Sequence, residues 1–124
     1  MSRRILACGS MLACIALFPG CAPKSVSYSA DVRPILARHC LECHAPGGVG
    51  SRASGFDVSS HESLMKGGKF GPFVVPGDPM GSNLIVLVEG RADPSIQMPH
   101  GRAKLEAREI QVLRDWVQQG AKNN

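Results

Sequence analysis

The chain has 124 residues and a formal net charge of +4, with 14 basic and 10 acidic side chains. This length indicates one domain. No Lys/Arg cluster or basic helical stripe is present, so we expect no nucleic-acid partner. Aromatic residues are only 5% of the chain, and a core of this size is marginal without an additional buried group or a covalent cross-link.

The N-terminal stretch has the pattern of an export signal. Arg3 and Arg4 precede the mostly apolar run Ile5–Phe18, which is the order found in secretory signal peptides. Gly20 followed by Cys21 is similar to a bacterial lipoprotein cleavage site. We therefore expect an exported, periplasmic protein that is attached to the membrane by a lipid on Cys21. Ordinary signal cleavage and a retained membrane anchor are the alternatives.

The predicted organisation has three parts. They are a signal peptide at 1–20, a short polar tether at 21–28 and one folded domain at 29–124. Cys8 and Cys14 would leave with the signal, and Cys21 would carry the lipid. Cys40 and Cys43 belong to a motif described below, so no pair of cysteines is left for a structural disulfide.

Helical spacing, capping residues and glycine terminators predict an all-α domain with long irregular loops. The expected helices cover 31–41, 61–66, 83–89 and 106–119, and the expected loops cover 45–55 and 91–104. Asp31 is expected to cap the first helix, because Pro34 is tolerated only near a helix start. The apolar run 83–89 is also compatible with a buried strand. Asp78 as the expected cap, with Pro79 at the first helical position, and Gly90 as a terminator favour a helix.

Cys40-Leu41-Glu42-Cys43-His44 reads C-x-x-C-H, the attachment pattern of c-type haem. Two thiols separated by two residues can each form a thioether with one vinyl group of the same porphyrin. His44 can then ligate the iron from the proximal side. The chain has no second C-x-x-C pair for a zinc ribbon and no βαβ pattern before the motif. The motif predicts one covalent haem c, with a zinc site or a dithiol redox centre as the alternatives.

Met65, Met80 and Met98 are the candidates for a methionine as sixth iron ligand, and Met98 is the best placed of them. It lies in a long loop between two helices, and Pro99 restricts its backbone toward an extended form. Such a loop can hold a thioether sulfur over the open haem face, where it favours ferrous iron and raises the potential. His100 is the main rival, and it would give iron with two histidine ligands. A methionine that simply fills an apolar gap is the alternative interpretation.

The clearest helix, 106–119, carries one apolar stripe that includes Trp116. Trp116 either packs against the porphyrin or anchors the last helix to the first. His39 and His61 are expected at the surface.

Several segments together resemble a known family. They are Asp31–Leu36 before the Cys40–His44 motif, Val75–Pro79, Gln97–Pro99 and Glu109–Ala121. On these segments the chain resembles class I-like cytochrome c domains and is most similar to the planctomycete type. The resemblance implies a cytochrome c fold whose first and last helices cross around a covalently bound haem. It also implies His44 and Met98 as axial ligands. The family often has Met-Pro-Pro, whereas His100 follows Pro99 here, which leaves ligation by two histidines open.

These features predict a monohaem carrier of single electrons with low-spin, His/Met-ligated iron and transient redox partner proteins, rather than an enzyme. The alternative is a haem enzyme or gas sensor whose distal site is open or ligated by His100.

Overall fold

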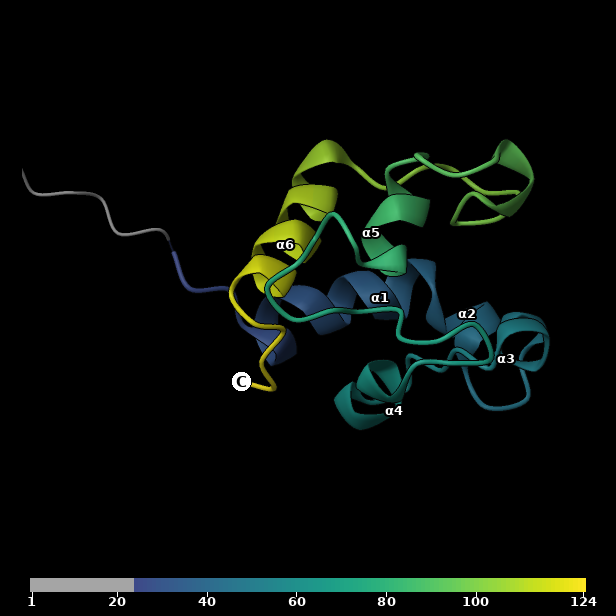
Figure 1. Ribbon diagram of the computed structural model, residues 1–124, viewed down its shortest axis with the longest axis horizontal. Helices are drawn as coiled ribbons and strands as arrows, with labels where there is room; N and C mark the ends of the chain where they lie inside the picture. The colour runs from purple at the N-terminus through teal and green to yellow at the C-terminus, as the bar shows by residue number, and fades with distance from the viewer. Residues whose placement is uncertain (1–23) are drawn as a thin grey trace, which may run out of the picture.

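Helices and connecting loops make up residues 24–124, the part of the chain that the computed structural model describes (Figure 1). Within these residues no strand forms, and β-pairing is confined to an isolated bridge between Gly68 and Gly71. The helical segments in chain order are the π-helical η1 (Tyr28–Val32), α1 (Arg33–His39), α2 (Leu41–His44), α3 (Val49–Ser54), α4 (His61–Lys66), α5 (Asn83–Val88), the 3₁₀-helical η2 (Pro94–Ile96) and α6 (Ala107–Gln118). The all-α class is confirmed for the described residues.

The first helical segment begins earlier than the sequence predicts. The Ser27 hydroxyl accepts a hydrogen bond from the Ala30 N–H at 3.2 Å, so Ser27 is the cap. Asp31, the predicted cap, instead accepts from the Ser27 N–H at 2.9 Å, and that prediction is wrong. Pro34 lacks an N–H and its ring would crowd the carbonyl one turn earlier. Because η1 ends at Val32 and α1 begins at Arg33, Pro34 lies in the first turn of α1, where its missing N–H is tolerated.

The core lies where η1, α1, α4, α5 and α6 meet. The largest fully buried side chains with apolar bodies are Trp116, Leu36, Leu64, Ile85, Leu113, Val32 and Val117. Burial of each aliphatic side chain stabilises the fold by about 1.5–3 kcal/mol. An aromatic contact also lies beside α2, where the rings of Phe56 and Phe73 stack with centroids 4.1 Å apart.

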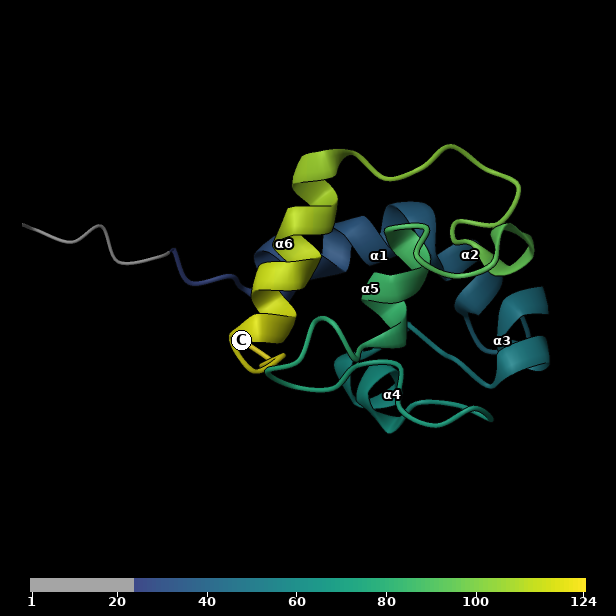
Figure 2. The ribbon, with the colours of Figure 1, turned by 45° about the horizontal axis from the view of Figure 1, so that its top comes forward.

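The first and last described segments are bonded to each other. The Tyr28 N–H donates to Oδ1 of Asn124 at 2.8 Å, and the Ser29 N–H donates to the Asn124 carbonyl at 2.9 Å. The rings of Tyr28 and Trp116 lie 5.7 Å apart, which anchors α6 to η1. In Figures 1 and 2 these segments form one end of the molecule, and α2 and α3 lie at the other end.

Three of the predicted helices are confirmed with small shifts at their ends. Ser60 caps α4 with a 3.0 Å hydrogen bond from the Ser63 N–H, and Gly67 follows its last residue. The run 83–89 forms α5 and not a strand, and Gly90 ends it with a left-handed φ of 69°. The helix begins at Asn83 after Ser82, so the predicted start at Asp78 and Pro79 is wrong. The Asp78 carboxylate instead accepts a hydrogen bond from the Gly81 N–H at 2.9 Å. The predicted helix at 106–119 is α6.

The predicted loop at 45–55 is wrong, because it contains α3. Its glycines have low helix propensity, but neighbouring groups stabilise the turn. Ser51 Oγ donates to the Ala45 carbonyl at 2.6 Å, and Lys69 Nζ donates to the last-turn carbonyl of Arg52 at 2.6 Å. Gly55 then ends α3 with a left-handed φ of 74°.

Residues 1–23 lie outside the described part of the chain, and so do the predicted signal peptide and Cys21. No helix within residues 24–124 has the length and apolarity required to cross a membrane.

Candidate haem-attachment site

The C-x-x-C-H motif lies where α1 ends and α2 begins. The Cys40 N–H donates to the Leu36 carbonyl at 2.9 Å, and the His44 N–H donates to the Cys40 carbonyl at 2.9 Å. Cys40 itself departs from helical geometry, with φ −123° and ψ −39°. The two thiols are three residues apart across a helical turn, and residues with this spacing are neighbours on a helix surface.

Both thiols are free and half-buried. Burial, followed by the neighbouring Cys43, raises the pKa of Cys40 to about 11. The Cys40 thiol is therefore protonated at neutral pH. Dithiol redox centres need the opposite, a lowered pKa that produces a thiolate, so this environment does not favour the dithiol alternative.

His44 is buried, with 8% of its surface exposed. Its Nδ1 lies 3.2 Å from the carbonyl oxygen of Phe56, and the Phe56 ring packs on it edge-on at 5.4 Å. A carbonyl oxygen can only accept, so Nδ1 donates the proton and Nε2 carries the lone pair. Metal-ligating histidines commonly hold their second ring N–H in this way, which fixes the tautomer and the ring orientation.

The loop that carries Met98 is connected to α2 by an ion pair. Arg102 Nη2 lies 2.6 Å from Oε1 of Glu42, one of the two residues between Cys40 and Cys43. The hydrogen bond from Arg102, together with its charge, lowers the pKa of Glu42. In both ribbon views the segment 91–104 reaches the end of the molecule where α2 lies (Figure 2). The structure thus brings the predicted sixth-ligand loop to the predicted attachment motif.

The candidates for the sixth ligand differ in burial. Met98 is half-buried against the core, and its N–H donates to the Leu87 carbonyl at 3.3 Å. His100 is exposed. Met80 is 60% exposed, and Met65 packs against the core from α4. Burial therefore favours Met98 over His100, whose side chain faces solvent.

Trp116 lies in α6 and packs against Tyr28 of η1. It is 1% exposed, and its Nε1–H donates to the Lys122 carbonyl at 2.9 Å. His61 packs edge-on against it with ring centroids 6.0 Å apart. These contacts are those of a residue that anchors the last helix. Packing of Trp116 against haem stays a prediction.

Both histidines predicted at the surface are half-buried and bonded. Nε2 of His61 lies 2.7 Å from the Ala121 carbonyl, so it joins α4 to the segment after α6. Nε2 of His39 lies 3.2 Å from the Glu109 carboxylate. The surface prediction is wrong for both. Their partners lie 60 and 70 residues away in the chain, and the local sequence pattern around each histidine cannot predict such distant contacts.

Glu109 is the residue near the motif that sequence reasoning missed. Its place in the first turn of the last helix predicts only a favourable interaction with the positive end of that helix, but it is 5% exposed. Arg38 Nη1 donates to it at 2.8 Å. Burial alone would raise the pKa of Glu109, but the Glu106 N–H, His39 and Arg38 outweigh burial and lower it. The only sequence signal was the helical spacing that places Glu109 one turn before Leu113.

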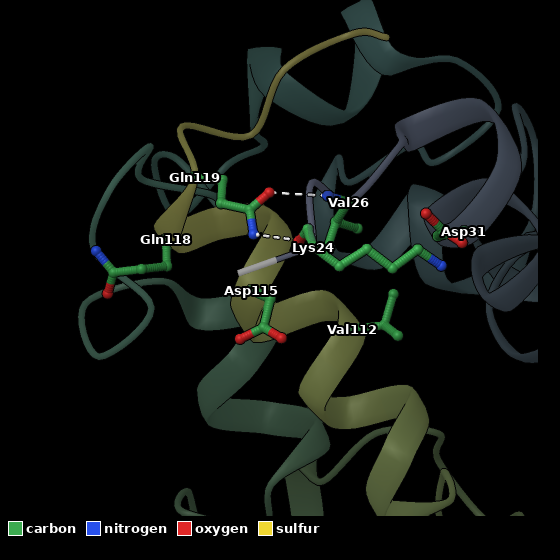
Figure 3. A pocket seen from close by; sticks show the side chains of 7 residues that line it. All are labelled: Lys24, Val26, Asp31, Val112, Asp115, Gln118 and Gln119. Atoms are coloured by element: carbon green, nitrogen blue, oxygen red, sulfur yellow. Dashed lines mark hydrogen bonds between the residues drawn. The ribbon is translucent and has the colours of Figure 1, made fainter. Parts of the chain in front are cut away.

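Two pockets of about 340 Å³ lie along α6 and the N-terminal segment. The first is shown in Figure 3, where Gln119 bonds both to the Val26 N–H and to the Lys24 carbonyl, at 2.8 and 3.1 Å. Neither pocket is lined by residues of the attachment motif or by Met98. They lie between the first described segment and the C-terminal part of the chain, and not at the candidate site.

The residues present fit a covalently attached haem better than a bare metal ion. Within residues 24–124, no group of three or more His, Cys, Asp or Glu side chains is placed to hold a metal ion, which does not favour the zinc alternative. Two free thiols and a buried imidazole with an available Nε2 lone pair are instead the donor set of a c-type haem site.

Comparison with known proteins gives one match. The family model described as Planctomycete cytochrome C matches residues 40–100. This segment starts at the first cysteine of the motif and includes Met98 and His100. No curated protein and no solved structure matched the chain.

Proposed function

We propose that this chain, whose residues 40–100 belong to the planctomycete cytochrome c family, is a monohaem electron carrier. Family membership implies haem c as the cofactor and suggests electron transfer rather than catalysis. We assign Cys40 and Cys43 as the thioether donors and His44 and Met98 as the axial ligands. When bound, the haem supplies an iron centre that gains or loses one electron.

The observation that carries this proposal is the buried His44 imidazole with Nδ1 held by the Phe56 carbonyl. This hydrogen bond directs the Nε2 lone pair away from Phe56 and fixes the orientation of the ring. Because the ring and its carbonyl partner are both held by packed elements, His44 needs little rearrangement when an iron changes charge. Small rearrangement is what a carrier of single electrons requires.

Met98 is proposed as the sixth ligand because its loop is connected to α2 and because its side chain is half-buried. A thioether in an apolar environment favours ferrous iron and raises the potential. It also fills the coordination position that a haem enzyme or gas sensor would leave open.

Substitution of Met98 tests this assignment against the alternatives. We expect Met98→Ala to lower the reduction potential and to let the reduced protein bind carbon monoxide, which the unmodified protein should not do. His100→Ala is the matched control and should leave both properties unchanged. An unchanged potential in Met98→Ala, with a changed one in His100→Ala, would establish His100 as the ligand. Carbon monoxide binding by the unmodified protein would favour the enzyme or sensor.

We also propose that the protein is exported and held at a membrane by a lipid on Cys21. Lys24 and Val26 are bonded to Gln119 at the end of α6. Only two residues separate Cys21 from Lys24, so the Cα atoms of these two residues can lie at most roughly 10 Å apart. In the ribbon views this end lies opposite α2 and α3, so the haem site would face away from the bilayer, toward soluble redox partners.

Membrane fractionation and depth-dependent fluorescence quenching test this localisation. Cys21→Ser should move the protein from the membrane fraction to the soluble fraction. A fluorophore on Lys122→Cys, at the end of α6, should be quenched by lipid-borne quenchers more strongly than one on Phe70→Cys, whose neighbour Lys69 bonds to α3. The reverse order of quenching would contradict the orientation, and unchanged fractionation would contradict the lipid anchor.

A further inference from the structure

Helix α3 packs directly on the imidazole of His44, and the contact is made at Gly50. A Cβ atom built on Gly50 would lie 2.6 Å from Cε1 of His44, 2.8 Å from Nε2 and 2.9 Å from Nδ1. Real Cβ atoms essentially never approach another atom to under 3.0 Å. Any side chain at position 50 must therefore displace either the imidazole or α3.

The backbone of Gly50 does not itself require glycine. Gly50 does not have a positive φ. It lies inside α3, where alanine is a better helix former than glycine. Local conformation would thus favour a larger residue. The close approach to His44 is the feature that a larger residue would disturb.

Helix α3 is also bonded to the chain immediately after His44. Ser51 Oγ donates to the Ala45 carbonyl at 2.6 Å and to the Gly48 carbonyl at 3.0 Å. On a different side of the imidazole, the Phe56 carbonyl lies 3.2 Å from Nδ1. The ring is therefore held by a hydrogen bond at Nδ1 and is backed by the α3 backbone at Gly50, where a Cβ would be too close to Cε1, Nε2 and Nδ1 alike.

We propose that Gly50 is a positioning residue for His44: the α3 backbone forms a wall that, with the Phe56 carbonyl, sets the orientation of the imidazole plane. This inference rests on the proposed function, because the orientation matters for a ring that ligates iron. Gly50 touches no reacting atom itself and acts only through His44.

Variants of the haem-loaded protein test this role. We expect Gly50→Ala to displace the hyperfine-shifted His44 ring signals in the ¹H NMR spectrum of the ferric protein and to shift the reduction potential. We also expect it to lower the midpoint of chemical denaturation, although alanine is the better helix former. Val49→Ala, on the same helix but 64% exposed, should leave the ring signals and the potential unchanged. A Gly50→Ala protein with a raised midpoint and unchanged ring signals would overturn the inference.

Ser51→Ala provides a second test that adds no bulk. It removes the bonds from α3 to Ala45 and Gly48, and we expect a smaller displacement of the same His44 signals. If Gly50→Ala yields no haem-loaded protein, Ser51→Ala decides, and unchanged ring signals would refute the role of α3. If the unmodified chain acquires no haem, the proposed function is wrong. In that case the His44 ring signals of haem-free Gly50→Ala, Ser51→Ala and Val49→Ala are compared with those of the haem-free unmodified protein. Unchanged His44 signals in Gly50→Ala and Ser51→Ala would refute this inference separately.

Discussion

The carboxylate of Glu109, in the first turn of α6, lies 2.8 Å from Nη1 of Arg38, near the end of α1. The Glu109 side chain is only 6% exposed, whereas that of Arg38 is 60% exposed. Nε2 of His39 also lies 3.2 Å from this carboxylate. Because His39 directly precedes Cys40, these contacts tie the last helix to the start of the haem-attachment motif.

Removing the Glu109 charge should destabilise the protein. In Glu109→Gln the buried side chain loses its charge-assisted bonds to Arg38 and His39, and such a loss costs about 1–3 kcal/mol of unfolding free energy. Chemical denaturation measures the change. Glu62→Gln, on the exposed surface of α4, is the control and should change the unfolding free energy by no more than about 0.5 kcal/mol. Equal effects of the two substitutions would contradict the structural role of Glu109.

The same carboxylate should make stability depend on pH. Although burial opposes it, the bonds from Glu106, His39 and Arg38 lower the pKa of Glu109 below its ordinary value of 4.5. The folded state therefore binds fewer protons at this site than the unfolded state. Its stabilising contribution is fully present above pH 4.5 and is lost as the pH falls through the folded-state pKa. The midpoint temperature of thermal unfolding should fall more steeply between pH 7 and pH 3 in the unmodified protein than in Glu109→Gln. Parallel curves would contradict this prediction.

Trp116 should matter for stability through its contacts with the chain ends. Trp116→Phe loses the part-buried hydrogen bond to the Lys122 carbonyl and leaves a gap where the 1%-exposed indole packs. We expect the lost bond and the gap together to cost roughly 1–3 kcal/mol of unfolding free energy. Phe70→Leu, which changes an aromatic residue that is 74% exposed, should have little effect. A visible haem spectrum that changes in Trp116→Phe would support the predicted packing against haem, and an unchanged spectrum would leave only the anchoring role.

The Glu42–Arg102 pair should control the mobility of the Met98 loop. Both groups are solvent-accessible, so salt screens the interaction and we expect little change in global stability. Glu42→Gln should instead speed amide hydrogen exchange selectively in residues 98–104. High salt should produce the same change in the unmodified protein. Arg91→Gln, which affects a different ion pair of the same loop, is the control. Exchange rates that do not respond to Glu42→Gln would show that the pair does not hold the loop.

Local patterns in the sequence predicted the elements that depend on neighbouring residues. Ser60 and Gly67 bound α4, Gly90 ends α5, and the apolar stripe of α6 faces the core, all of which the structure confirms. The attachment motif could be identified because its chemistry is local as well. The spacing of two thiols and a histidine is visible in five consecutive residues.

Features that depend on distant contacts could not be predicted. Helix α3 forms in a glycine-rich segment because Lys69 binds its last-turn carbonyls. The early start of η1 depends on bonds to Asn124. The burial of Glu109 depends on Arg38, which is 71 residues away in the chain. None of these partners lies within the span that helical or strand periodicity samples.

We propose that Cys40 and Cys43 carry one haem with His44 and Met98 as axial ligands. The most direct measurement is the visible spectrum of the protein after maturation in an export-competent, haem-attaching host, combined with denaturing extraction. We predict one haem per chain that resists extraction, with a methionine–iron charge-transfer band in the ferric state. Haem that extracts freely, or thiols at Cys40 and Cys43 that still react with alkylating reagent, would contradict the account.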